Sequence, residues 1–450
     1  MRKKTVFRGL IVIACMLASG NFVLPESHEH RNATGDTLLE HSSELNRMAE
    51  RLRYDGRYAE SEPLYREALE IIRQEKGEDH VMAAGIMNNL AELLRTQSCL
   101  DEAKRLYQTA LSILEHTLGA KDPAVATTLN NFAQLLVAKA EYQGAEQLYA
   151  RSLSIWEMTL GPKHPHVATV LNNIAELYRI QGRYTEAEPL YLRSLEIRKK
   201  TTERDEPAIA ASINNLGLLY FLQGRYDRSE SLLRQALEAR EKILGPNHPE
   251  VASSLNNLAE LLRVKDHHVS PEPLYTRALH IWQSAFGQEH PVVALCLSNL
   301  GSYYLTEGNT RKAIPLLERA LRIREQALGP EHPEVAGTMS VLAAAFRECH
   351  RIDEAERLLI RSLAVRERRL GLNHPDVART QVALAAVYSS KRRYTEALEL
   401  LQLASASLET NLTPNNPETK ACLKQYAQVL RKAHEGAAPL TLAGTAKTLW

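Results

Sequence analysis

The stretch HPEVASSLNNLAELLRVKD, residues 248–266, decides the fold of this chain. Its apolar residues fall at the spacing of one helical stripe, at Val251, Leu255, Leu258, Ala259 and Leu262. The proline near its start recurs every 42 residues, at Pro123, Pro165, Pro207, Pro249, Pro291, Pro333, Pro375 and Pro417. A fixed period of this length predicts a stack of identical supersecondary units, and such a stack usually works by binding.

Each unit is predicted to be a pair of amphipathic helices. The second helix is clearest in residues 184–200, YTEAEPLYLRSLEIRKK, which follow a Gly-Arg-Tyr turn. A glycine closes this helix in most units, four residues before the proline that suits the first turn of the next helix. We therefore expect one solenoid over residues 39–435, with nine helix pairs and a tenth first helix that caps the C-terminus.

The repeat resembles the tetratricopeptide repeat (TPR) in the 42-residue form of kinesin light chains and nephrocystin-like proteins. The similarity rests on LNNLAELL (255–262), on EPLY (62–65 and 188–191), on the LGxxHP linker (160–165) and on a small residue in the second helix, such as Ala103 or Ala187. It implies an all-α solenoid wound into a right-handed superhelix, whose concave groove binds proteins. No long heptad pattern precedes the repeats, so a motor-adaptor role is not supported.

The composition gives little sign of a nucleic-acid partner, because 55 basic and 54 acidic residues are interspersed along the chain. The N-terminus has a basic start, an apolar run over 9–17 and small residues at 18–20, which predicts a signal peptide over residues 1–20. An uncleaved anchor and a lipid on Cys15 are alternatives. We expect an exported protein, periplasmic or secreted, with residues 21–38 and 436–450 unpacked and its remaining cysteines unpaired.

Two columns of asparagines are the strongest candidates for a binding site. On a helix with 100° per residue, Asn89 points away from the stripe of Met87, Leu90, Ala91 and Leu94, while Asn88 lies on its flank. Asparagine is a mediocre helix former, so its repetition within the first helices calls for a reason. The flanking column is Asn88, Asn130, Asn172, Asn214 and Asn256, and the outward column is Asn89, Asn131, Asn173, Asn215, Asn257 and Asn299.

The family resemblance implies that this face lines the concave groove, where the amides hydrogen-bond the backbone of an extended peptide. Side-chain amides offer both donors and an acceptor, which suits a peptide backbone of any sequence. Charged residues beside the asparagines are expected to select the side chains of the bound peptide by their charge. They are Glu92, Arg95, Glu176, Arg179, Glu260 and Arg263. Leu218 and Phe221 are expected to form an apolar pocket in the groove. The alternative is that the asparagines bond neighbouring repeats and set the stacking.

Metal and catalytic sites find little support in the sequence. The histidines before the linker prolines, such as His164 and His332, are interpreted as helix caps that lie too far apart to share a metal. His267 and His268 occupy an irregular sixth unit, which makes a metal or enzyme site there the weakest alternative. Motifs for phosphate binding, for a nucleophilic serine and for a zinc protease are absent from the sequence. We predict no enzymatic activity and no cofactor.

The predicted function is that of a protein-interaction scaffold, which binds an extended peptide or protein segment in the groove of the second to seventh units. The two asparagine columns together form a ladder, and its outward column ends at Asn299, since Val341 and Ala383 take the next two positions. The alternative is a structural solenoid that associates with itself through its ends or its outer face. The alanine-rich C-terminal units, with residues 343–345 and 385–386, are the place expected for that contact.

Overall fold

The computed structural model describes residues 33–55, 57–97, 99–139, 141–201, 205–265, 269–411 and 417–436. Within these ranges the chain forms nineteen helices and no strand. The helices are α1 (Ala33–Tyr54), α2 (Tyr58–Lys76), α3 (Val81–Thr96), α4 (Leu100–Leu118), α5 (Pro123–Ala138), α6 (Tyr142–Leu160), α7 (Pro165–Ile180), α8 (Tyr184–Lys200), α9 (Glu206–Leu222), α10 (Tyr226–Leu244), α11 (Pro249–Lys265), α12 (Glu272–Phe286), α13 (Pro291–Thr306), α14 (Thr310–Leu328), α15 (Pro333–Glu348), α16 (Ile352–Leu370), α17 (Pro375–Ser390), α18 (Tyr394–Asn411) and α19 (Pro417–Gly436).

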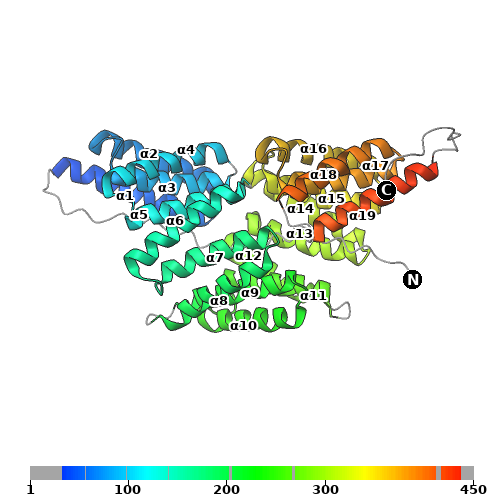
Figure 1. The fold of residues 1–450 in the computed structure, drawn as a ribbon, viewed down its shortest axis with the longest axis horizontal. Helices are drawn as coiled ribbons and strands as arrows, with labels where there is room; N and C mark the ends of the chain where they lie inside the picture. Colours follow the sequence, from blue (N-terminus) through cyan, green and yellow to red (C-terminus); the bar gives the residue numbers. More distant parts are fainter. Residues whose placement is uncertain are drawn as a thin grey trace, which may run out of the picture.

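Consecutive helices pair into nine units, unit 1 being α1–α2 and unit 9 being α17–α18, and α19 is the first helix of a tenth. The first helices lie on the inner side of the solenoid and the second helices on its outer side (Figure 1). The predicted all-α solenoid of nine helix pairs with a capping helix is therefore confirmed. α1 begins at Ala33, before residue 39, and the predicted signal peptide and the tail beyond residue 436 lie outside the described residues.

Capping fixes the boundaries of the units. The linker histidines have extended backbones, and each accepts a hydrogen bond at Nδ1 from the backbone N–H group two residues further on. The distance is 3.1–3.2 Å in His164, His290, His332 and His374. The predicted capping role of these histidines is confirmed. The glycine that ends most second helices has a positive φ, for example 91° at Gly119. Where the turn inside a unit lacks its glycine, His350 and Arg392 take up this left-handed conformation.

Small residues allow the helices of one unit to lie close together. Ala103, Ala145 and Ala187 in the second helices are fully buried. The first helices are buried on almost every side, since each lies between its own second helix and the first helices of neighbouring units. In α3 every residue from Ala83 to Leu94 is buried, asparagines included. The inner side of the solenoid is thus a packed layer of first helices.

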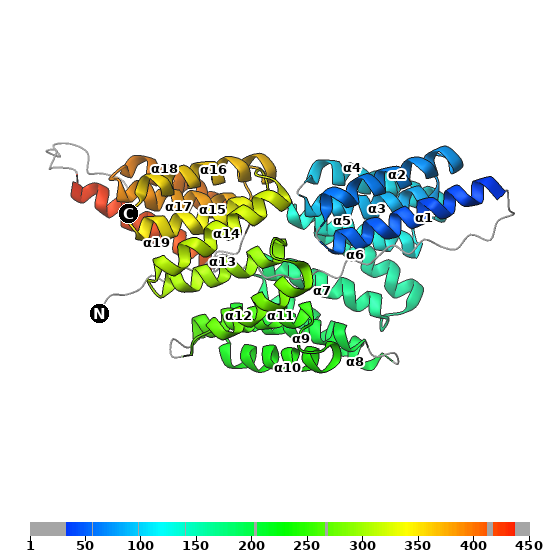
Figure 2. The ribbon, with the colours of Figure 1, turned by 180° about the vertical axis from the view of Figure 1, so that it is seen from behind.

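The solenoid turns far enough for its first and last three units to lie side by side. Figures 1 and 2 both show units 1–3 beside units 7–9, with units 4–6 joining them below. Each unit has a hairpin edge, where its two helices are joined, and a linker edge, where it is joined to the next unit. The hairpin edge of units 1–3 faces the linkers that join units 6–9. About six units therefore complete one superhelical turn.

The hairpin position shared by Tyr54, Thr96 and Ala138 takes part in this inter-turn contact at three successive steps. His332 Nε2 donates to the carbonyl oxygen of Thr96 at 3.0 Å, because Nδ1 of the same ring is used as the helix cap. One unit earlier, Phe286 stacks on His290, and its ring centroid lies 6.3 Å from that of Tyr54. One unit later, His374 faces the backbone of Ala138. Repetition at a spacing of 42 residues makes the contact a property of the superhelix.

The cysteines and the length of the apolar segments complete the description of the fold. Cys99, Cys296, Cys349 and Cys422 are free, as expected. No helix in the described part of the chain is long and apolar enough to cross a membrane.

The inter-turn contact predicts a sensitivity to acid. Burial lowers the pKa of His290 to about 4 and also lowers the pKa of His332 and His374. The unfolded or opened chain therefore binds protons more readily, so the stability of the contact is present above the ordinary histidine pKa of about 6.5 and is lost as the pH falls toward the folded values. Between about pH 7.5 and pH 5, we expect a loss of about 1 kcal/mol or more, because one pKa unit corresponds to ~1.4 kcal/mol.

Hydrogen exchange of the amides in the last turns of α1, α3 and α5, corrected for the intrinsic effect of pH, measures this opening. The control is the triple variant His290→Asn, His332→Asn and His374→Asn, in which an uncharged side chain keeps the cap. Its exchange should depend much less on pH. An equal dependence in both proteins would show that these histidines do not hold the turns together.

Candidate functional site

The asparagine columns join neighbouring first helices to one another. Each outward asparagine donates from Nδ2 to Oδ1 of the flanking asparagine one unit earlier. The distances are 3.4 Å for Asn131 to Asn88, 2.9 Å for Asn173 to Asn130, 3.1 Å for Asn215 to Asn172, 3.2 Å for Asn257 to Asn214 and 3.0 Å for Asn299 to Asn256. The ladder is therefore a set of contacts between units, which is the alternative that the sequence left open.

The predicted exposure of the outward column is wrong. Asn89 is 7% exposed and Asn131 is 1% exposed, while Asn215 alone in this column is half-buried. Helical geometry placed Asn89 correctly away from the second helix of its own unit. The prediction from a single helix took no account of the preceding first helix, α1, which covers that side. Asn89 donates to Asn46 Oδ1 (3.2 Å) and to Glu50 Oε1 (2.9 Å) of α1.

Asn46 and Glu50 extend the ladder into unit 1, and the sequence reading missed them. The signal was present, because these residues lie one period before Asn88 and Glu92. They were missed because only a single asparagine occurs there, within a degenerate copy of the motif. The ladder of asparagines therefore begins at α1, in unit 1.

The predicted glutamates and arginines form three similar clusters, each closed by a tyrosine of the second helix. Arg95 and Tyr107 both donate to the carboxylate of Glu92, at 2.6 and 3.3 Å. Tyr191 and Tyr275 hold the same place beside the pairs Glu176–Arg179 and Glu260–Arg263. These clusters occur in units 2, 4 and 6, so they alternate along the inner layer.

Charge pairing within these clusters outweighs the cost of burial. Burial alone raises the pKa of Glu92, but the charge and hydrogen bonds of Arg95 bring it below its ordinary value. Burial, together with the neighbouring carboxylate, raises the pKa of Tyr107 well above its usual range. The arginine side chains are exposed by 20% at Arg95, 11% at Arg179 and 4% at Arg263. Arg95 and Arg179 are therefore the charges of this set that a partner reaches most easily.

The units between these clusters carry uncharged residues at the same positions. Unit 3 has Gln134 in place of the glutamate, and both atoms of its amide are buried without a hydrogen-bond partner among the described residues. The Oδ1 atom of Asn173, on the next first helix, also lacks one there. Unit 5 has Leu218 and Phe221, which pack against Leu233 and Leu258 in the core. The prediction of an open apolar pocket at these two residues is wrong, because the neighbouring first helix fills the space.

The inner layer opens slightly where the ladder ends. Ser340, Ala344 and Ala383 line a crevice of about 10 Å³ between α15 and α17, with Leu359 of α16 also in its lining. Small side chains replace amides and carboxylates here, so the helices leave a gap with room for about one water molecule or methyl group. The sequence reading placed binding in units 2–7, and it missed this opening in units 8 and 9.

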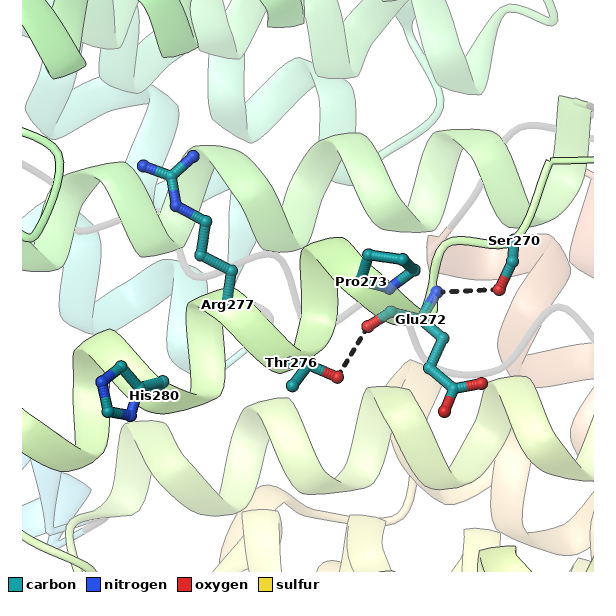
Figure 3. Close-up of a pocket in the computed structure, with 6 residues that line it drawn as sticks. All are labelled: Ser270, Glu272, Pro273, Thr276, Arg277 and His280. Carbon is teal, nitrogen blue, oxygen red and sulfur yellow. Dashed lines mark hydrogen bonds between the residues drawn. The ribbon is translucent and has the colours of Figure 1, made fainter.

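The irregular sixth unit has a hollow on its outer side. Its lining comes from one segment, Ser270–His280, and borders an open depression of about 540 Å³ beside α12 (Figure 3). Its charged residues do not converge, since Arg277 pairs with Glu241 of α10 while Glu272 accepts a hydrogen bond from Tyr304 of α13. His267 and His268 lie outside the described residues. No cluster of three metal-ligating side chains occurs in the part of the chain that the structure describes.

Removal of the amide ladder is expected to loosen the stack. The triple variant Asn131→Ala, Asn173→Ala and Asn215→Ala leaves buried oxygens of Asn88, Asn130 and Asn172 without these donors, at a cost of about 1 kcal/mol for each site. A lower midpoint of thermal unfolding checks this. Gln108→Ala, at an exposed position of α4, serves as a single-site control and should change little. A triple variant as stable as the parent would mean that the amide bonds contribute nothing to stacking.

Comparison with known proteins identifies the repeat. The tetratricopeptide repeat model matches residues 41–98, 82–155, 125–200, 208–269, 272–326, 308–368 and 334–410, and a second model of the same description matches 251–292. A search of curated proteins gives no match.

Solved structures with related folds include other repeat proteins. The crystal structure of BtubC (BKLC) from P. vanneervenii shares 23% identity over 53% of this chain and 92% of its own, with a TM-score of 0.40. A protein of Podospora anserina, described as a kinesin light chain with nearly identical TPR-like repeats, shares 26% identity over 45% and 96%, with a TM-score of 0.39. A Rap protein complexed with Competence and Sporulation Factor shares 14% over 78% and 99%, with a TM-score of 0.48. The family models span most of the described solenoid, and the chain therefore belongs to the tetratricopeptide repeat family.

Proposed function

We propose that this protein is a non-catalytic protein-interaction scaffold that binds an extended segment of a partner along its inner layer. The observation that carries the proposal is the run of tetratricopeptide repeats from residue 41 to residue 410. Proteins built from such stacked repeats present long surfaces and generally work by binding.

The asparagine ladder enters this proposal through an exchange of hydrogen bonds. Each amide carries two N–H donors and an oxygen with two lone pairs, so one bond between neighbouring units does not use its full capacity. A strand-like segment offers alternating N–H and C=O groups along its length. Replacement of an amide–amide bond by an amide–backbone bond costs little net free energy, since one hydrogen bond is exchanged for another. Slight separation of the first helices would then open the ladder to a ligand.

Gln134 and Asn173 are the first places where such a segment would bind. Their buried amide atoms without described partners supply one donor group and two acceptor oxygens on adjacent first helices. A buried polar group without a partner is costly, and a ligand that satisfies it recovers that free energy. Arg95 and Arg179 lie in units 2 and 4, on either side of unit 3. They would favour acidic side chains that flank the bound backbone.

Two further proposals come from the sequence. We propose that residues 1–20 direct export of the chain, with an uncleaved anchor or a lipid on Cys15 as alternatives. An enzyme or metal site in the sixth unit remains the weakest alternative.

Quantitative capture tests the scaffold proposal. The full chain, immobilised, would retain a partner that is identified and then purified for titration. The variant Arg95→Gln with Arg179→Gln should weaken the affinity by about tenfold, which corresponds to ~1.4 kcal/mol for the loss of two partly buried charges. Helicity and the thermal midpoint show whether the variant still folds.

The matched control changes the same residue type on the outer side. Arg66 and Arg234 are 46% and 58% exposed and pair with Glu62 and Glu230 of their own helices. Their substitution by glutamine should leave the affinity unchanged. Equal binding by the inner variant and the parent would exclude the inner layer as the binding surface, and equal loss in both variants would point to an effect of net charge alone.

A further inference from the structure

The inter-turn contact uses only part of two long edges. It joins the hairpin edge of units 1–3 to the linkers that connect units 6–9, so each first helix of units 1–3 meets the start of the sixth first helix after it. With nine units, the linkers that join units 1–6 to one another and the hairpin edge of units 4–9 have no counterpart within the described chain. Each of these edges amounts to about one full superhelical turn.

The unused linker edge exposes two residues whose counterparts in the inter-turn contact are half-buried. Leu118 and Leu160, in the last turns of α4 and α6, are 42% and 43% exposed. They hold the same repeat position as Phe286 and Leu370. Phe286 contacts Tyr54, and Leu370 packs against the apolar core of the N-terminal units. The linker edge of units 2 and 3 is therefore equipped for the same contact but does not make it.

The unused hairpin edge offers the complementary surface. Ile180, Leu222 and Val264 lie in the last turns of the first helices of units 4, 5 and 6, at the position that Thr96 and Ala138 hold in units 2 and 3. All three are half-buried and apolar. These positions therefore match the surface on which His332 and His374 rest.

The terminal helices also expose apolar side chains among the polar residues that usually cap a solenoid. On α19, Leu423 and Leu430 are 46% and 38% exposed, and on α1, Leu38 and Met48 are 42% and 47% exposed. These two pairs of exposed apolar residues lie on the terminal faces at opposite ends of the stack. A face at one end can therefore cover the face at the other end only in a different molecule.

We propose that a second copy of this chain docks its linker edge on the hairpin edge of the first copy and continues the superhelix. The second copy is the partner that these surfaces fit, because the molecule already displays the same contact between its own turns. Such a contact joins two different surfaces, so it does not close into a dimer and instead adds copies in series along the superhelical axis. The assembly is independent of the inner layer that the proposed function uses.

Sedimentation velocity of the full chain over a concentration series tests the proposal. We expect a series of oligomers whose size increases beyond the dimer as the concentration rises. The variant Leu118→Lys with Leu160→Lys should raise the concentration at half-assembly by tenfold or more, since burial of an unpaired charge costs more than the ~1.4 kcal/mol of a tenfold change. Lysine suits the last turn of a helix, so both second helices should remain folded.

The control is Leu192→Lys with Ile360→Lys, at mid-helix positions that are 45% and 48% exposed on the outer side. This variant should assemble as the parent does, with the circular dichroism of all three proteins unchanged. A strictly monomeric parent or one that stops at a closed dimer would overturn the proposal. Assembly that survives the edge variant, or that is lost equally in the control, would also overturn it.

Discussion

Burial of each first helix between its neighbours is the constraint on which the rest of this structure depends. A single helix pair has two apolar faces and covers only one of them by itself, so each unit needs the next unit to bury the other. In α3 this leaves an unbroken run of twelve buried residues, Ala83–Leu94. Polar side chains within that run must therefore find partners in adjacent units, as Asn88 and Asn89 do. The amide ladder is a consequence of the close packing of first helices.

The sequence predicted what depends on neighbours in the chain. The period of 42 residues, the capping histidines and the boundary glycines are local features, and they sufficed for nineteen helices in nine pairs with a final first helix. The exposure of Asn89 was predicted wrongly because a helical wheel shows one helix and one partner, whereas α3 also lies against α1 and α5. The core position of Phe221 was missed for the same reason.

The contact between superhelical turns was beyond the reach of the sequence. It depends on a small rotation from each unit to the next, which adds up over six units until His332 reaches Thr96. No single residue encodes that rotation, because it results from many side-chain volumes along the stack. Yet the residues that make the contact recur in most units, which is why the same edge is half-buried at Leu370 and exposed at Leu160. The same linker edge of the repeat is therefore covered in one part of the chain and exposed to solvent in another.

The most direct test is a distance between the second helices of units 2 and 8, which Figures 1 and 2 show facing each other across the turn. Spin labels at the exposed positions Thr109 of α4 and Arg361 of α16, introduced as an unnatural amino acid, leave the four free cysteines in place. Pulsed dipolar spectroscopy should give a single narrow distribution at the separation of these two helices. A broad distribution that extends to much longer distances would contradict the closed superhelical turn.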